Sequence, residues 1–521
     1  MQADERLPAV DPGRRRDDAV GKCAPPATRQ MTFAPACART VSNPRASIQE
    51  VDPVRYVSTR GQAPVLSFTD ALLAGLARDG GLYVPEAYPQ LSGEQIAGFA
   101  GQTYAQVAEQ VIGRFVGDEI EPGAFRKMLE ESYGCFRHPA VTPLAQIGDN
   151  LFVLELFHGP TLAFKDVAMQ LLARMMDHAL KARGQRATIV GATSGDTGAA
   201  AIEAFSGLSQ VDVFIMYPHC RVSEVQRRQM TGVDAPNIHT IALEGTFDDC
   251  QAILKGLFNN LAFRDGLKLS GVNSINWARV VAQTVYYFTS AAVLGGPQRK
   301  ISYAVPTGNF GDVLAGYIAK SMGLPIERLV VATNENDILA RAIDSGAYEV
   351  RGVTPTVSPS MDIQVSSNFE RLLFDACGRD ADVVRSLMNS LSQGGRFDVP
   401  EGALAQVRNE FDAFRTGETG TAKEIARVYQ ECGYLIDPHT AVGVHAGRKA
   451  LAKKPGTPMV VLGTAHPAKF SDAVRAATGT QAPLPAHLAQ LMSAPEHFTV
   501  LPNDQRVIEG FVRERARAAR D

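Results

Sequence analysis

Short apolar runs of strand length alternate with longer, more polar segments from about residue 150 to residue 465. The runs are Leu151 to Leu156, Ala187 to Gly191, Val211 to Tyr217, His239 to Leu243, Ile301 to Val305, Leu329 to Thr333 and Met459 to Leu462. Between them, apolar residues recur at the spacing of one helix face, as in Val167, Leu171, Leu172, Met175 and Met176. This alternation predicts an α/β fold with a parallel sheet covered on both faces. Because ligands of such sheets bind outside the carboxyl ends of the strands, the loops that follow the strands are expected to carry the site.

Changes in this pattern divide the chain into predicted parts. Ordered sequence begins at about Tyr56, and a mostly helical stretch follows to about Tyr133. The charge-rich stretch from Val383 to Gly433 has no strong strand and predicts an inserted helical subdomain. The predicted parts are a disordered extension (1–54), a small N-terminal domain (55–135), an α/β domain (136–300), a second α/β domain with the helical insertion (301–480) and a C-terminal tail (481–521).

Composition narrows the class of protein. A chain of 521 residues that is 45% hydrophobic has enough apolar material for two or three domains. Lys and Arg number 52 against 55 Asp and Glu, and no basic stripe appears, so we expect no nucleic-acid partner. The longest apolar runs, such as Val281 to Leu294, are interrupted by polar residues, so we expect no membrane segment.

The seven cysteines form no CxxC pair, so neither a disulfide framework nor a zinc site is predicted, and a cytoplasmic, reducing location fits. The first 54 residues lack the apolar core of a secretory signal, and their acidic residues argue against a transit peptide. We interpret them as an over-long start of the reading frame.

The first loop of interest runs from His158 to Asp166 and places Lys165 at the start of a predicted helix. The partial positive charge of a helix N-terminus disfavours an ammonium ion and favours a neutral amine, which prepares a lysine for Schiff-base chemistry. A solvated surface lysine is an equally open reading of the loop, although the apolar run from Leu162 to Phe164 favours burial.

Two further loops predict anion sites. Gly191 to Gly198 offers backbone N–H groups and hydroxyls at a helix N-terminus, although the same residues also suit a tight turn capped by Asp196. Gly308 and Gly311, in the loop from Pro306 to Asp312, bring backbone amides close to a phosphate. A capped turn is again the alternative there.

Two more segments supply polar groups. Thr464, which follows the strand from Met459 to Leu462, can hydrogen-bond a heterocyclic nitrogen or cap a turn. The stretch from Asn273 to Arg279 supplies amides, a hydroxyl and a guanidinium suited to bidentate recognition of phosphate. The alternative there is a helix start capped by Asn276, with Arg279 on the surface.

The order and the amino-acid sequences of these loops together resemble those of the threonine synthase family, which are pyridoxal-phosphate enzymes of fold type II in the tryptophan synthase β-like group. The resemblance runs from about Tyr56 to Asp472. Its most specific pieces are Tyr56 to Gly61, which resembles the family's amino-terminal start, and His158 to Asp166, which resembles its lysine motif. The loops 191–198, 273–279 and 307–312 resemble its substrate and phosphate loops.

The resemblance implies two doubly wound parallel-sheet domains, a small N-terminal domain and pyridoxal 5′-phosphate as cofactor. Lys165 would be the catalytic, cofactor-binding lysine, and Asp196 would lie near the cofactor's phenolic oxygen, where dehydratases and cysteine synthases carry asparagine. The other implied cofactor-binding residues are Gly308, Asn309, Phe310, Gly311 and Asp312 for the phosphate and Thr464 for the pyridine nitrogen. The implied substrate-binding residues are Ser194, Thr197, Asn273, Ser274 and Arg279. One departure is Ala163, where many members have serine, and we assign it no catalytic role.

The implied reaction converts O-phospho-L-homoserine and water into L-threonine and phosphate, the last step of threonine biosynthesis. Because no separate regulatory segment precedes the lysine motif, we expect a monomer or homodimer, and we assign no metal-binding residue. A related phospho-lyase would instead release a 2-oxo acid, ammonia and phosphate. A third possibility is a catalytically inactive, ligand-sensing protein on the same fold.

Overall fold

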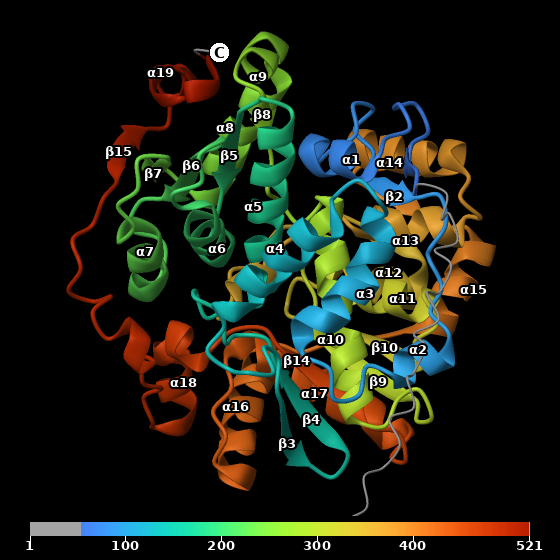
Figure 1. Cartoon of the computed structure of the whole chain (residues 1–521). Helices are drawn as coiled ribbons and strands as arrows, with labels where there is room; N and C mark the ends of the chain where they lie inside the picture. The colour runs from blue at the N-terminus through green and yellow to red at the C-terminus, as the bar shows by residue number, and fades with distance from the viewer. Residues whose placement is uncertain (1–53, 520–521) are drawn as a thin grey trace, which may run out of the picture. The chain divides into compact units, whose positions relative to one another are not determined.

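The computed structural model describes residues 54–519, and apart from Val54 the predicted disordered extension lies outside the described residues. Strands of two larger sheets occur at all seven of the predicted apolar runs (Figure 1). These strands are β4 (Leu151–Glu155), β5 (Ala187–Ala192), β6 (Val211–Pro218), β7 (Ile238–Glu244), β9 (Ile301–Pro306), β10 (Ile326–Thr333) and β14 (Met459–Gly463).

The six-stranded sheet has the order β13-β10-β9-β14-β4-β3. All of its pairings are parallel except that of β3 (Leu144–Gly148) with β4. One face packs with α16 (Glu418–Cys432) and α17 (Pro438–Lys453), and the opposite face contributes Val460 and Leu462 to the core that contains α10 (Trp277–Val293) and α11 (Gly311–Ser321). Helices therefore cover both faces, as the apolar runs predicted.

The five-stranded sheet is parallel throughout and has the order β15-β7-β6-β5-β8. Val190 and Phe214 face a core with α8 (Phe247–Asn259) and α19 (Gln505–Arg515), whereas Ile189 and Val213 face the main core with α5 (Lys165–Ala182) and α6 (Asp196–Phe205). Neighbouring residues of each strand thus enter different cores because side chains alternate between the faces of a strand.

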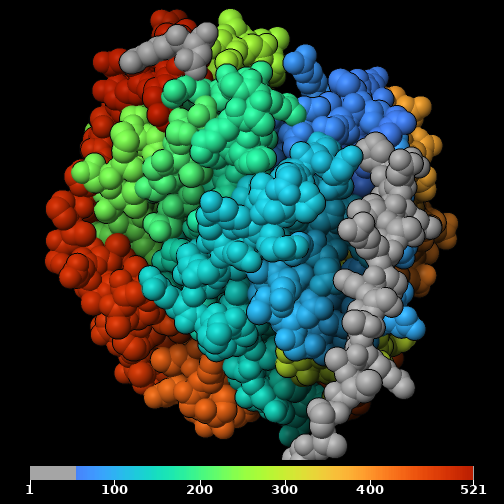
Figure 2. Space-filling model, in the orientation of Figure 1, coloured from blue at the N-terminus to red at the C-terminus, as the bar shows by residue number. Residues whose placement is uncertain are grey.

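The predicted boundaries at residues 300 and 480 do not separate the two sheets. β3 and β4 precede residue 300 but belong to the six-stranded sheet. The tail, in turn, supplies β15 (Thr499–Pro502), which pairs with β7. In Figure 2 these C-terminal residues, in red, lie beside the green residues of the five-stranded sheet. Pairing across long stretches of chain decides sheet membership, and a local pattern does not record it.

The segment from Val383 to Gly433 is not purely helical, which corrects the interpretation of a helical subdomain without a strand. It contains β12 (Arg396–Asp398), which pairs with β11 (Ala347–Glu349), and β13 (Phe411–Arg415), which is the edge strand beside β10. Asp412 and Arg415 make β13 more polar than a central strand, because an edge strand has solvent on one side. β8 (Leu269–Ser270) and β15 escaped prediction because they are edge strands of only two and four residues.

The N-terminal part of the described chain is mostly helical, as predicted. A two-stranded antiparallel sheet pairs β1 (Tyr56–Ser58) with β2 (Tyr83–Pro85). Thr103 and Gln106 form a capping box that starts α3 (Tyr104–Val116), and the apolar face of α3 packs on α10. The other helices of this part are α1 (Phe68–Ala74), α2 (Gly93–Ala97) and α4 (Pro122–Gly134).

The remaining helices lie around these layers (Figure 1). They are α7 (Glu224–Thr231), α9 (Leu261–Gly266), α12 (Ile338–Ser345), α13 (Phe369–Ala376), α14 (Ala381–Gly394), α15 (Glu401–Glu410) and α18 (Ser471–Thr478). No helix between residues 54 and 519 combines the length and the apolar character that a membrane span requires.

Candidate functional site

A cavity of about 590 Å³ lies where the loops after β5, β9 and β14 meet the first turns of α5, α6, α10 and α11. Its walls contain every site residue that the sequence predicted. These residues are Lys165, Ser194, Asp196, Thr197, Asn273, Ser274, Arg279, Gly308, Asn309, Phe310, Gly311, Asp312 and Thr464. Segments up to 299 residues apart in sequence are therefore brought together by the sheet topology.

Lys165 is the first residue of α5 and is buried, with 8% of its surface exposed, so it is not a solvated surface lysine. Its Nζ lies 3.3 Å from Asp196 Oδ2 and 4.7 Å from the centre of the Phe164 ring. Burial lowers the pKa of Lys165, Asp196 opposes that effect, and the cations of Lys469 and Arg279 lower the pKa further. The net direction favours the neutral, nucleophilic form of the amine.

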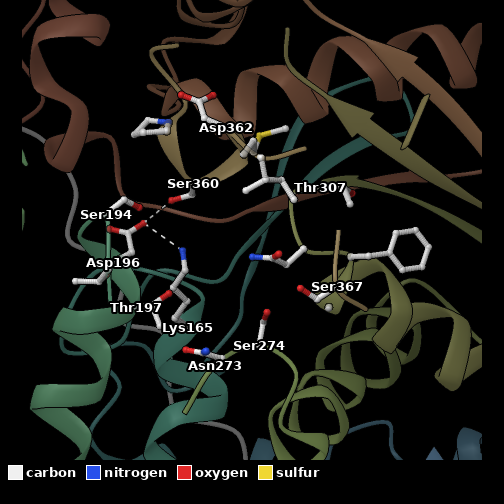
Figure 3. Close-up of a pocket in the computed structure, with 18 of the residues that line it drawn as sticks. Lys165, Ser194, Asp196, Thr197, Asn273, Ser274, Thr307, Ser360, Asp362 and Ser367 are labelled. Atoms are coloured by element: carbon white, nitrogen blue, oxygen red, sulfur yellow. Dashed lines mark hydrogen bonds and ion pairs between the residues drawn. The ribbon is translucent and has the colours of Figure 1, made fainter. Parts of the chain in front are cut away.

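Asp196 is the centre of a buried polar cluster. It accepts hydrogen bonds from Gln226 Nε2 at 2.9 Å and from Ser360 Oγ at 3.4 Å, and Lys469 Nζ lies 2.8 Å from Oδ1. Figure 3 shows Lys165, Asp196 and Ser360 turned toward one another from different elements. Burial alone would raise the pKa of Asp196, but Lys469 and then Lys165 hold it well below its ordinary value. This carboxyl group is therefore ionised at neutral pH.

The loop before α6 is shaped by Thr193. Thr193 Oγ1 accepts from the backbone N–H groups of Gly195 and Gly198, both at 3.0 Å. Gly195 has a φ of +140°, a conformation that side chains rarely adopt, and a Cβ there would lie 2.5 Å from Gln226. Asp196 is the first helical residue and does not cap the helix through its side chain, so the simple capped turn is not its role.

The loop between β9 and α11 comes close to a second segment. A Cβ on Gly308 would lie 2.8 Å from the carbonyl oxygen of Ser360, so only glycine fits without a backbone shift. Phe310 occupies the left-handed region with a φ of 63° and directly precedes α11, without a side-chain cap. The N–H groups of the first turn of α11 are thus available to an anion.

Buried polar atoms without a hydrogen-bond partner gather beside this loop. They are Arg279 Nε, Gln283 Oε1 and Asp312 Oδ2, and all three residues line the cavity. Burial lowers the pKa of Arg279 to about 10, still far above neutrality, and its Nη1 donates to the Val272 carbonyl at 2.8 Å. Arg279 is therefore a buried cation, not a surface arginine. Buried polar atoms normally have partners, so this wall is built to receive a polar ligand.

Asp312 differs from Asp196 in its surroundings. Tyr286 OH donates to Asp312 Oδ1, and Tyr287 OH donates to the backbone oxygen of Asp312 at 2.9 Å. Burial raises the pKa of Asp312 to about 7 even though both tyrosines lower it. A carboxyl group that is partly protonated at neutral pH can donate a hydrogen bond to an anion.

A buried histidine fixes the position of the Ser360 segment. His439 Nε2 accepts from the backbone N–H of Ser360 at 3.2 Å, and His439 Nδ1 lies 2.7 Å from Asp437 Oδ2. Because Nε2 accepts, Nδ1 carries the proton and donates to Asp437. Thr440, next in sequence, accepts from the N–H of Thr464 at 3.3 Å. His466, and not Thr464, caps the 3₁₀ turn that follows.

The start of α13 connects two cavity loops. Asn368 Nδ2 donates to the backbone oxygens of Ser274 and Asn309, at 3.2 and 3.0 Å. Arg371, which is fully buried, donates to the Ile275 carbonyl at 2.7 Å and to the Tyr83 carbonyl. These bonds hold the loop before α10 against the loop before α11.

The amino-terminal stretch from Tyr56 to Gly61 reaches the same helix. Arg60 forms an ion pair with Glu370 at 3.0 Å, and Thr59 Oγ1 donates to Glu370 Oε1 at 2.6 Å. The stretch thus has a structural place: it anchors α13, whose neighbouring residues tie the two loops together.

Several cavity or cluster residues escaped sequence reasoning. They are Gln226, Gln283, Ser360, His439 and Lys469. Ser360 and His439 lie in segments that follow no predicted strand directly. Lys469 lies at the end of the loop in which Thr464 was predicted as a cofactor ligand. A lysine three residues after a histidine does not by itself indicate a functional role. In the described range 54–519, no three His, Cys, Asp or Glu side chains are placed to hold a metal ion.

The cavity fits the pyridoxal phosphate that the resemblance implies. A buried amine with a lowered pKa is present for its aldehyde, and the Gly308 cradle and the unpartnered Arg279 Nε are present for anionic groups. The ionised Asp196 beside Lys165 suits the phenolic oxygen of the ring.

Comparison with known proteins gives three family matches that together span most of the described chain. Residues 55–133 match the threonine synthase N terminus, residues 135–390 match the pyridoxal-phosphate dependent enzymes, and residues 440–512 match the C-terminal part of threonine synthase. A threonine synthase of Pseudomonas aeruginosa is 54% identical over 460 residues, which cover 88% of this chain and 98% of that protein. A human protein called threonine synthase-like 2 is 34% identical over 86% of this chain and 93% of its own.

Solved structures give the same picture. A pyridoxal-phosphate-bound threonine synthase of Brucella melitensis is 60% identical and superposes with a TM-score of 0.87, covering 89% of this chain and 100% of its own. The threonine synthase of Escherichia coli is 32% identical, with a TM-score of 0.73 over 88% of this chain and 99% of its own.

Proposed function

This chain belongs to the threonine synthase family, and we infer that it converts O-phospho-L-homoserine and water into L-threonine and inorganic phosphate with pyridoxal 5′-phosphate as cofactor. It is a carbon–oxygen lyase acting on phosphate. The observation that supports the role of Lys165 most directly is its buried amine, held 3.3 Å from an ionised aspartate at a helix N-terminus.

The cofactor, when bound, supplies an electron sink for the carbanion chemistry at the substrate carbons. The reaction removes phosphate from Cγ and places a hydroxyl group on Cβ, so protons leave Cα and Cβ and return to Cγ and Cα. Lys165 is the group placed to move them, because its Nζ faces the cavity and its lowered pKa suits exchange of a proton near neutrality.

The cofactor phosphate and the two anionic groups of the substrate need separate places. We assign the cofactor phosphate to the loop from Gly308 to Asp312, where N–H groups of α11 and the Gly308 cradle allow close approach. Arg279, with Asn273 and Ser274 from the loop before α10, holds an anionic group of the substrate. Ser194 and Thr197, at the start of α6, bind the other one.

Positioning accounts for much of the expected rate. Asn368 joins the Ser274 and Asn309 loops, so the distance between the two anion sites is fixed by hydrogen bonds within the protein. A substrate phosphate held at one site and a cofactor phosphate held at the other then align Cγ and Cβ with Lys165. Thr464 lines the same cavity beside the lysine loop, where its backbone oxygen accepts from the N–H of Phe164 at 2.9 Å, and its hydroxyl would meet the pyridine nitrogen of the cofactor.

The test is to supply purified protein with pyridoxal phosphate and O-phosphohomoserine and to measure phosphate and amino-acid products. Equal amounts of threonine and phosphate are expected from the wild type, and Lys165→Ala is expected to lower the rate by at least about 1,000-fold because the nucleophile and proton carrier are lost. Release of a 2-oxo acid and ammonia with the phosphate would instead identify the phospho-lyase reaction. Absence of turnover together with absence of bound cofactor would sink the assignment.

We also propose a cytoplasmic location and a monomer or homodimer that acts on small molecules and binds no nucleic acid. The five cysteines of the described range, Cys135, Cys220, Cys250, Cys377 and Cys432, are all free, which suits a reducing compartment. Light scattering of the purified protein measures the assembly directly.

A further inference from the structure

A second lysine contacts Asp196 without lining the cavity. Lys469, whose side chain is 0% exposed, places its Nζ 2.8 Å from Asp196 Oδ1 and 2.8 Å from the carbonyl oxygen of Thr161. Unlike Lys165, it does not line the cavity. The two lysines therefore contact different oxygens of one carboxylate, and only one of them faces the ligand.

Within the group of Lys165, Lys469 and Asp196, the charges are balanced only when one lysine is neutral. Two cations and one anion leave a surplus positive charge in a buried place, which is costly. Asp196 and Lys469 by themselves form a neutral pair that needs nothing from the cavity side. Lys165 can then lose its proton without leaving Asp196 as an unpaired buried anion.

Other charged groups lie around the cluster, but among the described residues only Asp196 forms an ion pair with the two lysines. Arg279 of α10 adds a further cation that disfavours a protonated Lys165. Asp166 is held by the N–H and hydroxyl of Thr161, and burial raises its pKa to about 6 although Lys469 lowers it, so this carboxyl group is mostly ionised at neutral pH. Asp312 of α11 is partly protonated at neutral pH. No ion pair joins Asp166 or Asp312 to either lysine among the described residues.

We propose that Lys469 is a positioning residue that acts as the permanent counterion of Asp196 and so leaves Lys165 free to work as a neutral amine. This proposal rests on the role assigned to Lys165 above.

The test measures the reactivity of Lys165 in the full-length protein freed of cofactor, so it does not depend on turnover. Trace labelling with acetic anhydride across a range of pH, followed by mass spectrometry of the Lys165 peptide, reports the apparent pKa of that amine. With Lys469→Gln, Lys165 becomes the only cation beside Asp196, so its labelling at neutral pH should fall by about tenfold for each unit that its pKa rises. Lys469→Arg keeps the charge and should stay within about threefold of the wild type.

A double variant guards against a loss that merely reflects damage to the fold. Lys469→Gln with Asp196→Asn replaces the ion pair by a neutral hydrogen-bonded pair, and labelling of Lys165 should recover relative to Lys469→Gln alone. An unchanged labelling profile in Lys469→Gln would overturn the proposal. So would failure of the double variant to recover, or an equal loss in Lys469→Arg. None of these results requires the substrate, so a wrong substrate assignment and a wrong counterion assignment are distinguishable.

Discussion

The two walls of the cavity differ in how many of their charged and polar side-chain atoms have partners within the protein. On the lysine wall, Asp196 has close partners in Lys165, Lys469 and Gln226. On the arginine wall, made by Arg279, Gln283 and Asp312, each side chain retains a buried atom without a partner. The reacting groups are thus positioned by contacts within the protein, whereas the groups of the arginine wall keep hydrogen-bonding capacity for a ligand. Removal of a charged side chain should therefore destabilise the cofactor-free protein on the lysine wall, but not on the arginine wall.

The largest effect is expected on the lysine wall. Asp196→Ala leaves Lys469 as a buried cation without its ion-pair partner, and removing one partner of a buried ion pair typically costs about 3–5 kcal/mol of unfolding free energy. Urea unfolding of the cofactor-free protein measures this loss. Asp248→Ala is the matched control, since Asp248 also lines the cavity but is exposed, and it should change stability by less than about 0.5 kcal/mol. Equal stability of the two variants would erase the contrast between the walls.

Arg279→Met tests the other wall and should separate stability from binding. Relieving a buried cation of its desolvation leaves the cofactor-free protein as stable as before or more stable. Substrate binding loses charge-assisted hydrogen bonds, so the KM for O-phosphohomoserine should rise by roughly 10- to 100-fold. Arg279→Lys keeps the charge but not the planar guanidinium group, so its KM should lie between those of the wild type and Arg279→Met. Destabilisation of the free protein by several kcal/mol, with an unchanged KM, would show that Arg279 is structural.

Gly308→Ala sharpens the comparison at the phosphate loop. Its Cβ would lie 2.8 Å from the Ser360 carbonyl, so the loop must move away from the position that we assign to the cofactor phosphate. Overpacking of this kind costs about 1–3 kcal/mol, which should weaken cofactor binding by roughly 10- to 100-fold in equilibrium dialysis. Gly352→Ala is the control because a Cβ there meets nothing within 4 Å. The prediction fails if both variants bind the cofactor as tightly as the wild type.

The smallest effect is a pH dependence that belongs to Asp312. Its folded-state pKa of about 7 lies above the ordinary value of 3.8, so the folded protein binds this proton more tightly than the unfolded chain does. The contribution of Asp312 to the unfolding free energy is therefore fully present below its ordinary pKa and is lost as the pH rises through about 7. Between about pH 6 and pH 8 the cofactor-free wild type should lose about 1 kcal/mol relative to Asp312→Asn. Parallel stability profiles of the two proteins would refute the shift.

The sequence predicted the central strands because each is a run of apolar residues buried on both faces, as in Val211 to Tyr217. It missed β13, whose Asp412 and Arg415 are typical of an edge strand, and β15, which is an edge strand of only four residues. Lys165 and the glycine loops were found because each directly follows a strand. Ser360 and His439 were missed because they reach the cavity through hydrogen bonds from segments with no such local mark.

The α/β class, the central strands and the loops that carry Lys165, Asp196 and Gly308 could be predicted from the sequence, since apolar periodicity and strand-to-helix loops are local properties. The contact of Lys469 with Asp196, which lie 273 residues apart in the chain, could be found only in the folded structure. The tertiary structure also decided that Arg279 and Asp312 keep unpartnered atoms in one cavity. Charge balance and hydrogen-bond satisfaction depend on which distant groups meet, and only the packed sheets and helices fix those meetings.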